Sequence, residues 1–490
     1  MERVKAYLKT VDEVVAKGPY RPDWESLADH PLPRWYRDAK FGIFIHWGAY
    51  SVPAFDNEWY PRNMYVKGQR AFDHHVKTFG PHKSFGYKDF IPQFRGEKFD
   101  AAAWADLFRA AGARFVMPVA EHHDGFPMYD CSFTDWSAVT MGPRRDVVGE
   151  LARECAARDL VLTASSHRVE HYWFLSGARE FDSDIQGEIP YGHLYWPTKP
   201  RPFGDDEQEG IHVGPVDTDF LDDWLARTCE LVDKYRPRIL YFDWWIQVEP
   251  MKPYLKRFAA YYFNRAAEWG IEVTINYKHD AFLHGVGVRD IERGQLAGIS
   301  PSFWQNDTAV AKNSWGYTEG NDYKQPGELI ADLIDVVSKN GSLLLNIGPR
   351  ADGSIPAEDQ AILRAVGAWL AVNGDGIYGT RPWRLLGEGP TVTTEGYFTD
   401  TLRSPYTSED FRFTFRGTSL YAFALKWPAD GVVKIQTLGA KSHRFRSPIR
   451  SVSVLGYEGP VSWNQADGWL EIRADLAPTT LPVGLRIALD

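Results

Sequence analysis

The chain is short of cysteine, of long apolar runs and of positive charge. Its 490 residues include only three cysteines, too few for a disulfide framework, so we expect a reducing compartment. No apolar run approaches the roughly 18 residues that span a membrane, so we expect no membrane partner. Residues 1–18 are charged throughout, which predicts no secretory signal and a cytoplasmic protein. The net charge of −10 argues against nucleic acid as a partner.

The composition is that of a folded globular protein. Hydrophobic residues make up 44% of the chain and charged residues 24%, enough to bury a large core. At roughly 150 residues per domain, the length allows about two or three domains. The 19 tryptophans suit core packing, interfaces and sugar rings alike, so their number alone leaves the function open.

Strands and helices alternate from residue 41 to residue 374. The expected strands are 41–48, 114–121, 160–166, 238–244, 271–277, one near 296–304, and 342–348. The expected helices are 100–113, 146–158, 218–235, 251–269, 326–341 and 356–374. This alternation predicts a parallel sheet, and about seven strands predict an irregular (β/α)8-like TIM barrel. A doubly wound open sheet is the alternative, but it usually carries a GxGxxG turn that the first strand here lacks.

The pattern changes near the C-terminus. After about residue 380, apolar and polar residues alternate with period two between Gly and Asp turns, which predicts an antiparallel β-sandwich. We therefore expect a catalytic barrel with an N-terminal helical extension over 1–380, and a β-sandwich over 381–490. A structural cap is the preferred interpretation of the sandwich, and a carbohydrate-binding module is the alternative. The acidic segment 178–215 is expected to be a long loop of the kind that carries function.

Polar or aromatic residues end every expected strand. Chemistry in a barrel of this kind lies at the carboxyl ends of the strands. These ends are His46-Trp47, Glu121-His122-His123-Asp124, Ser165-Ser166-His167, Asp243-Trp244-Trp245, Asn276-Tyr277-Lys278, Trp304-Gln305-Asn306 and Asn346. Seven such endings together favour an active site over coincidence.

Single residues in this set carry both structural and chemical interpretations. Asp243 is either a helix cap or surface ion pair, or a carboxylate held in an aromatic pocket and able to attack a substrate carbon. The adjacent His122 and His123 suggest a metal, but neighbours on a strand point to opposite faces, so we prefer imidazoles that bind substrate hydroxyls. Glu58 and Glu292 are polar loop residues by default, and binding or catalytic carboxyls if their loops cover the pocket.

The motifs taken together resemble the α-L-fucosidases of glycoside hydrolase family 29. The stretches that carry the resemblance, between about residues 34 and 383, are WYRDAKFGIFIHWGAYSVPAFDNEWY, YKDFIPQF, EHHDGF, GPRRDVVGEL, LYFDWW, SWGYTEG, LLLNIGPRADGSIP and GIYGTRPW. The resemblance implies an irregular barrel followed by a β-sandwich, and a retaining, exo-acting hydrolase of α-linked L-fucose. The implied partner is a fucosylated oligosaccharide or glycoconjugate, and no metal or cofactor is expected.

The resemblance also implies roles for individual residues. Asp243 matches the nucleophile and Glu292 the acid/base, with Glu170 as the reserve candidate for the second role. The positions that match fucose-binding residues are His46, Glu58, Trp59, His122 and His123. The candidates for an aromatic wall against the 6-methyl group are Trp244, Trp304 and Trp315.

Three positions depart from the family pattern. Gln305 stands where a Glu often follows the tryptophan. Lys278 stands where the fifth strand often ends in Arg; Lys keeps the positive charge but lacks the planar fork of Arg, and we expect it to bind substrate. Ser165-Ser166-His167 replaces a tyrosine-rich end of strand three. These departures keep two alternatives open: a fucoside-binding protein with little hydrolysis, and a retaining glycosidase for a related sugar such as galactose. The sequence leaves the oligomeric state open.

Overall fold

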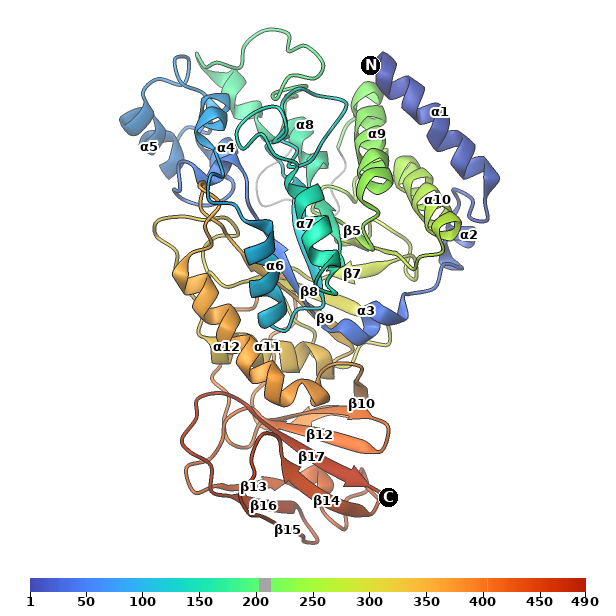
Figure 1. Ribbon diagram of the computed structural model, residues 1–490, viewed down its shortest axis with the longest axis vertical. Coiled ribbons are helices and arrows are strands. Elements are labelled where there is room, and N and C mark those ends of the chain that lie inside the picture. The colour runs from blue at the N-terminus through green and yellow to red at the C-terminus, as the bar shows by residue number, and fades with distance from the viewer. Residues whose placement is uncertain (202–212, 403) are drawn as a thin grey trace.

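The computed structural model describes residues 1–201, 213–402 and 404–490, and its larger part is a closed parallel barrel (Figure 1). Closure follows because β1 pairs with β2 on one side and with β9 on the other. The barrel strands are β1 (Phe41–Ile45), β2 (Phe115–Glu121), β3 (Val161–Leu162), β4 (Ala164–Ser166), β5 (Ile239–Phe242), β6 (Thr274–Tyr277), β7 (Val288–Asp290), β8 (Trp304–Ala309) and β9 (Gly341–Ile347). Because β3 and β4 follow one another along β2, the barrel has eight strand positions, and the expected (β/α)8-like fold is confirmed.

Two details of the expected strand series are wrong. The short strand β7 was missed, because its three residues include the exposed Arg289 and give no apolar run. The strand expected near 296–304 begins only at Trp304 and continues to Ala309. Its sequence WQNDTA is fully buried but largely polar, because its polar side chains have hydrogen-bond partners: Gln305 bonds to Asp290 inside the barrel, and Asn306 bonds to backbone carbonyls outside it. Apolar periodicity therefore cannot detect it.

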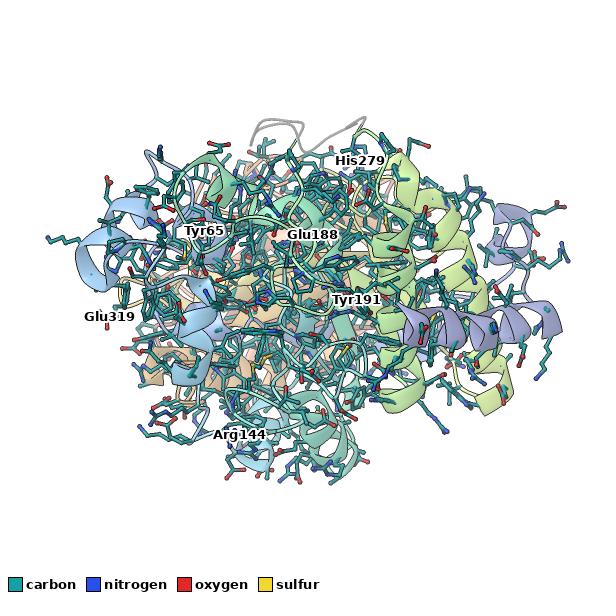
Figure 2. The ribbon with its side chains drawn as sticks, turned by 90° about the horizontal axis from the view of Figure 1, so that it is seen from above. Tyr65, Arg144, Glu188, Tyr191, His279 and Glu319 are labelled. Carbon is teal, nitrogen blue, oxygen red and sulfur yellow. The ribbon has the colours of Figure 1, made fainter. Side chains whose placement is uncertain are left out.

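Helices surround the strands. They are α1 (Glu2–Lys17), α2 (Trp24–Ala28), α3 (Arg34–Ala39), α4 (Tyr60–Asn63), α5 (Arg70–Phe79), α6 (Ala101–Ala110), α7 (Val147–Ala156), α8 (His171–Phe174), α9 (Thr218–Tyr235), α10 (Lys252–Trp269), α11 (Pro326–Ser338) and α12 (Ala357–Asn373). Asp100 and Asp146 cap α6 and α7 by accepting backbone N–H groups. Figure 2 shows α1 lying against α9 and α10 at one side of the barrel. No helix within the described residues is long and apolar enough to cross a membrane.

The alternation of side chains along each strand separates two parts of the core and positions the polar residues. On β1, Ile43 and Ile45 join the apolar layer under the helices, whereas Phe44 joins a cluster inside the barrel. Tyr241 on β5 belongs to the same inner cluster. The next inward position after Tyr241 is Asp243, two residues further along the chain. The strands thus carry apolar residues into the barrel and then present polar residues at its carboxyl-terminal mouth.

A buried lysine just before β1 is expected to cost stability. Lys40 is fully buried, and its ammonium has no hydrogen-bond partner among the described residues. Burial, with help from the nearby Arg381, lowers the pKa of Lys40 to about 7. Below that pH the fold therefore has to hold a charged, unpaired amine.

Replacing Lys40 with methionine is expected to raise the free energy of unfolding at pH 6 by about 1–3 kcal/mol, the typical cost of an unpaired buried polar group. Between pH 7 and the ordinary lysine pKa only the unfolded wild type keeps the proton, so the wild type gains stability and the advantage of the variant shrinks. Urea unfolding at pH 6 and pH 9 measures both effects. The exposed Lys9→Met is the control, and a variant less stable than the wild type at pH 6 would contradict the argument.

Two antiparallel sheets follow the barrel. Their strands are β10 (Arg381–Glu388), β11 (Phe411–Arg416), β12 (Ser419–Ala424), β13 (Val432–Ile435), β14 (Ile449–Val454), β15 (Val461–Gln465), β16 (Leu470–Ala474) and β17 (Val483–Leu489). The strand orders are β10-β11-β12-β17-β14 and β13-β16-β15, and both sheets contribute to one apolar cluster. The helices α11 and α12 lie between the barrel and these sheets (Figure 1). Buried Arg412 on β11 pairs with Asp335 on α11 at 2.5 Å, which ties the two parts together.

The acidic segment 178–215 lies partly outside the described residues, because 202–212 are not among them. Its first part includes a 3-10 helix over Ser176–Glu180 and an irregular chain that packs beside α8. The expectation that the whole segment forms a functional loop stays a prediction.

Candidate active site

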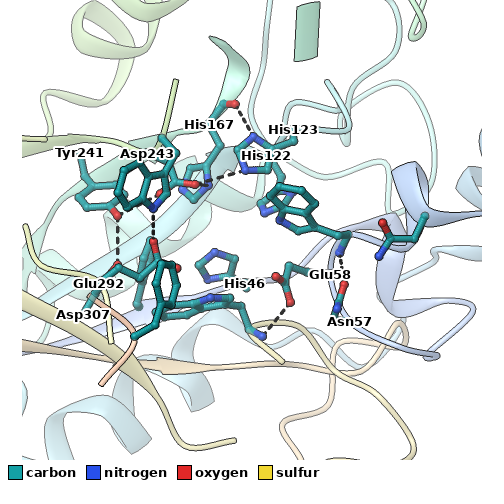
Figure 3. Close-up of a pocket in the computed structure, with 16 residues that line it drawn as sticks. His46, Asn57, Glu58, His122, His123, His167, Tyr241, Asp243, Glu292 and Asp307 are labelled. Carbon is teal, nitrogen blue, oxygen red and sulfur yellow. Dashed lines mark hydrogen bonds and ion pairs between the residues drawn. The ribbon is translucent and has the colours of Figure 1, made fainter. Parts of the chain in front are cut away.

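A pocket of about 250 Å³ lies at the carboxyl-terminal mouth of the barrel (Figure 3). Its walls combine imidazoles, carboxyls and aromatic rings. The residues that line it are Phe44, His46, Asn57, Glu58, Trp59, Asn63, His122, His123, His167, Tyr241, Asp243, Trp244, Glu292, Asp307, Trp315 and Phe398. They come from most strands of the barrel, and one of them, Phe398, comes from the connection between β10 and β11.

Asp243 follows β5 and is held by donors on both carboxylate oxygens. Oδ2 lies 3.2 Å from His123 Nε2 and 3.2 Å from His167 Nδ1. Oδ1 accepts a hydrogen bond from the Tyr241 hydroxyl at 3.3 Å and lies 3.9 Å from Lys278 Nζ. These contacts leave 13% of the Asp243 side chain exposed to the pocket.

The charges around Asp243 keep it ionised. Burial would raise the pKa of Asp243, but His167, His123 and Lys278 together lower it well below its ordinary value. His123 is itself held as a cation. Burial opposes its charge, but Glu170, 3.4 Å from Nδ1, and Asp243 raise the pKa of His123 to about 9. These contacts favour the ionised form of Asp243 at the tip of β5.

Glu292 provides a second carboxyl, and its pKa is shifted in the opposite direction from that of Asp243. It follows β7 (Val288–Asp290) by two residues, and the loop that carries it brings it to the pocket wall. Its Oε2 accepts hydrogen bonds from Trp244 Nε1 at 2.6 Å and Lys278 Nζ at 3.0 Å. Burial raises the pKa of Glu292 to about 7, with Lys278 opposing and Asp243 adding to the shift. Since both donors bind Oε2, a proton on this group belongs on Oε1.

Lys278 stands beneath the two carboxyls, in a cluster that is closed to water. Its fully buried ammonium donates to Asp290 Oδ2 at 2.6 Å and lies 3.4 Å from Asp307 Oδ2. Burial raises the pKa of both Asp290 and Asp307. Gln305 Nε2 donates to the other oxygen of Asp290 at 2.7 Å. The departures at 278 and 305 are therefore linked, because Asp290 binds both side chains.

His46 is a neutral imidazole of defined tautomer. Asn346 Nδ2 donates to the Trp315 carbonyl at 2.6 Å, so Asn346 Oδ1 is the acceptor that faces His46 Nδ1 at 2.7 Å. His46 therefore carries its proton on Nδ1 and leaves Nε2 as an acceptor. Burial and the neighbouring His167 lower the pKa of His46 well below its ordinary value.

Two further polar groups have capacity left for a ligand. Glu58 Oε2 accepts hydrogen bonds from Ser314 Oγ at 3.2 Å and Trp315 N at 2.8 Å, while Oε1 remains for another donor. The Nδ1 atom of His122 is buried without a hydrogen-bond partner among the described residues. Burial, together with His123 and His167, lowers the pKa of His122 well below its ordinary value. An unsatisfied neutral imidazole at a pocket wall is suited to bind a hydroxyl group.

The imidazoles also form a donor set that a metal ion can use. Ring nitrogens of His46, His122 and His167 lie within 4.8 Å of one another. His122 and His123 both line the pocket, because β2 ends at Glu121 and strand alternation no longer applies to them. The expected opposite orientation of this pair is therefore wrong. They still belong to separate donor groups, since His123 lies with His167 and Asp243.

Most residues singled out in the sequence meet in the pocket. Those that line it are His46, Glu58, Trp59, His122, His123, Asp243, Trp244, Glu292 and Trp315. Lys278, expected to bind substrate, lies beneath the pocket and is not part of its lining, because its fully buried ammonium is bound by carboxyls of the barrel interior. Trp304 lies outside, because it begins β8 instead of ending a strand; its indole donates to the Lys339 carbonyl at 3.0 Å. Glu170 is buried behind His123 and is held by Arg201 at 3.3 Å.

Several pocket residues were not among the expected site residues. His167 stands at the end of β4, a position that strand endings had already marked. Tyr241 lies on the inner face of β5 and Asp307 on the inner face of β8. Because side chains alternate along a strand, counting back in steps of two from Asp243 would have identified Tyr241 as an inward residue. Phe44 precedes His46 by two residues along β1, so the same alternation predicts that it faces into the barrel. Phe398 gives no local signal, because it lies far along the chain.

Comparison with known proteins agrees with this geometry. The family model described as Alpha-L-fucosidase matches residues 7–375, and the model described as Alpha-L-fucosidase C-terminal domain matches residues 404–489. The tissue alpha-L-fucosidase of Rattus norvegicus is 31% identical over 96% of this chain and 92% of its own length. That of Homo sapiens is 30% identical over 91% and 85%. The crystal structure of Thermotoga maritima alpha-fucosidase with a mechanism-based inhibitor has a TM-score of 0.76 at 29% identity, covering 96% of this chain and all of the other.

The pocket is rich in imidazoles and aromatic rings, and it holds two carboxyls that differ in protonation state. At the mouth of a parallel barrel, this arrangement is typical of a glycoside hydrolase. The chain belongs to the α-L-fucosidase family, glycoside hydrolase family 29, as both family models and the full-length relatives show.

Proposed function

We propose that the protein is an exo-acting, retaining α-L-fucosidase that removes terminal α-linked L-fucose from oligosaccharides or glycoconjugates by double displacement. The observation that carries this proposal is the pair Asp243 and Glu292. One carboxyl is held ionised and the other is protonated up to about pH 7, and both contact the same lysine. That pairing supplies a nucleophile and an acid in one pocket.

In the first step, the Asp243 carboxylate attacks the anomeric carbon and forms a glycosyl ester, while Glu292 gives its proton to the leaving oxygen. In the second step, Glu292, now ionised, takes a proton from water, and the water oxygen displaces Asp243 from the anomeric carbon. Lys278 serves both steps: it stabilises Asp243 before attack and Glu292 after proton transfer, because it lies 3.9 and 3.0 Å from their oxygens.

The two carboxyls lie close enough together for the retaining arrangement. Asp243 Oδ1 and Glu292 Oε2 both lie near Lys278 Nζ, so these two atoms are no more than about 7 Å apart. Retaining enzymes place their carboxyls about 5–5.5 Å apart, and inverting enzymes about 6.5–9.5 Å apart to admit a water molecule. The close approach of these two oxygens is compatible with the retaining arrangement.

The rest of the pocket fits one deoxy sugar. His46 Nε2 and Glu58 Oε1 have hydrogen-bonding capacity left, which suits them to bind the hydroxyl groups of the sugar. Phe44 and Trp315 lie beside them with ring centroids 6.2 Å apart, an apolar wall for the 6-methyl group. The pocket volume of about 250 Å³ suits one sugar residue, which supports exo action.

Hydrolysis of 4-nitrophenyl α-L-fucoside followed by proton NMR tests the stereochemistry. We expect the α-anomer of fucose to appear first and then to mutarotate, and we expect no change in rate with excess EDTA. The β-anomer as first product would overturn the retaining mechanism. Binding of fucose with no turnover of any activated fucoside would instead favour a binding protein, and faster turnover of a β-D-galactoside would favour the related-sugar alternative.

A further inference from the structure

A phenylalanine from beyond the barrel stands at the mouth of the pocket. Phe398 lies in the connection between β10 and β11, yet it lines the same pocket as Glu292 and Trp244. It remains 46% exposed, whereas Trp244 is only 6% exposed. The proposed reaction makes no use of this ring, because the proposed fucose contacts come from residues at the strand ends and in the loops that follow them, such as His46, Glu58 and Trp315. An exposed aromatic face at a pocket rim is therefore available to another part of the substrate.

The position of Phe398 is fixed relative to the proposed acid/base. Its backbone N–H donates to the carbonyl of Glu292 at 2.9 Å, and two residues later Asp400 N donates to the carbonyl of Arg293 at 2.8 Å. The Asp400 carboxylate is in turn buried and bound by Lys324 and Arg293. The segment that carries Phe398 is thus paired along the segment that carries Glu292. These backbone hydrogen bonds hold Phe398 at a fixed place beside Glu292.

The backbone of Phe398 is strained in a way that its own packing does not explain. Its φ angle is 56°, in the left-handed region where glycine is favoured and a bulky side chain costs energy. Such strain persists where surrounding contacts hold it, and it is concentrated at functional sites. The ring gains little burial in return. Instead it stacks on Trp244, with centroids 6.5 Å apart and planes inclined by 19°.

Trp244 connects this ring to the reaction centre. Its indole N–H donates to Glu292 Oε2 at 2.6 Å, and its ring stacks on Phe398. The leaving oxygen has to meet Glu292, so the group attached to that oxygen emerges beside Trp244 and Phe398. Aromatic faces bind the apolar C–H faces of pyranose rings. The neighbouring Tyr397, whose hydroxyl accepts hydrogen bonds from Arg289 at 3.1 Å, offers a polar edge for hydroxyl groups.

We propose that Phe398 forms the leaving-group subsite of this enzyme, by stacking on the neutral hexopyranose to which fucose is attached. This inference rests on the proposed fucosidase function. The segment between β10 and β11 would then take a direct part in substrate selection. The ring contributes binding energy from the non-reacting sugar, which holds the scissile oxygen near Glu292.

The test compares Phe398→Gly with the wild type on two substrates. Glycine removes the ring and also suits the positive φ, so the variant is expected to fold with an unchanged or higher Tm. One substrate is α-L-fucosyl fluoride, whose leaving group has no ring. The other is the best-cleaved member of a panel of fucosyl-hexose disaccharides. We expect kcat/KM for the disaccharide to fall about tenfold more than kcat/KM for the fluoride, mainly through KM.

Leu402→Ala is the matched control, since Leu402 is 65% exposed in the same segment and does not line the pocket. Equal losses on both substrates, or no loss on the disaccharide, would overturn the subsite. A wild type that cleaves the fluoride but shows no difference between Phe398→Gly and Leu402→Ala would overturn it as well, and leave the fucosidase function intact. A wild type that cleaves neither substrate would refute the proposed function itself.

Discussion

Replacing Asp243 with asparagine is expected to lower kcat for an aryl α-L-fucoside by a factor on the order of 10⁴ or more, the scale of a lost nucleophile. Asparagine keeps the size and the contacts to His123 and His167, but it removes the charge that attacks the anomeric carbon. Initial rates with 4-nitrophenyl α-L-fucoside measure the loss. Because Asp243 ends a strand with most of its surface buried, Tm by differential scanning fluorimetry shows whether the variant is folded.

A smaller replacement separates chemistry from binding. In Asp243→Gly, added azide fits the space left by the carboxylate and is expected to restore part of the turnover by attacking the activated fucoside directly. Asp280→Asn is the control, since Asp280 lies at the surface with 70% of its side chain exposed. Wild-type rates in a folded Asp243→Asn protein would show that another group attacks the sugar.

Replacing Glu292 with glutamine is expected to lower kcat/KM for a fucosyl disaccharide by roughly 10²–10⁴-fold, the usual contribution of general acid–base catalysis. The same change should alter the pH profile. The active form of the enzyme needs the proton on Glu292, whose pKa is raised to about 7, so wild-type kcat/KM falls as the pH rises through about 7. Asp243 is ionised far below that pH, and His123 keeps its charge up to about pH 9. Neither residue therefore causes the fall in kcat/KM near pH 7.

In Glu292→Gln the fall in kcat/KM near pH 7 is expected to disappear along with most of the activity. For 4-nitrophenyl α-L-fucoside, kcat/KM should fall less than for the disaccharide, because 4-nitrophenolate is weakly basic and departs without a proton. The exposed Glu319→Gln, outside the pocket, is the control. A descending limb that survives at pH 7 in Glu292→Gln would move the acid/base role to another carboxyl, with Asp307 in the pocket as the first to examine.

The barrel and the nucleophile position were accessible from sequence because local patterns carry them. RILYFDWW is an apolar strand that ends in one carboxylate, and β5 ends just before Asp243 in the structure. Apolar strands also end just before His46 and His122. Strand endings of this kind converge in any parallel barrel, so the pocket follows from topology once the strands are found.

The polar half of the barrel was harder to predict. Strand β8 presents Gln305 and Asp307 inward, and β7 presents Asp290, so neither strand shows an apolar run. Their burial depends on Lys278, which contacts Asp290 and Asp307 from a third strand. Contacts between residues far apart in sequence are invisible to periodicity.

The same cluster explains two of the three departures from the family pattern, those at residues 278 and 305. With Lys at 278 and Gln at 305, Asp290 accepts hydrogen bonds from both and satisfies both. Viewed singly, each departure suggested a weakened site. Viewed together, they form a closed network that still places a positive charge 3.0 Å from Glu292. The position of Phe398 is a similar case, because only the paired backbones of 292–293 and 398–400 bring it to the pocket.

Trapping of the covalent intermediate tests the central claim most directly. Incubation with 2-deoxy-2-fluoro-α-L-fucosyl fluoride, followed by intact mass spectrometry and peptide mapping, locates the glycosyl ester. The account predicts one fluorofucosyl group per chain, on the peptide that contains Asp243, and none in Asp243→Asn. An ester on Glu292 or Asp307, or steady turnover of the α-L-fucoside by an enzyme that never accumulates an ester, would contradict it.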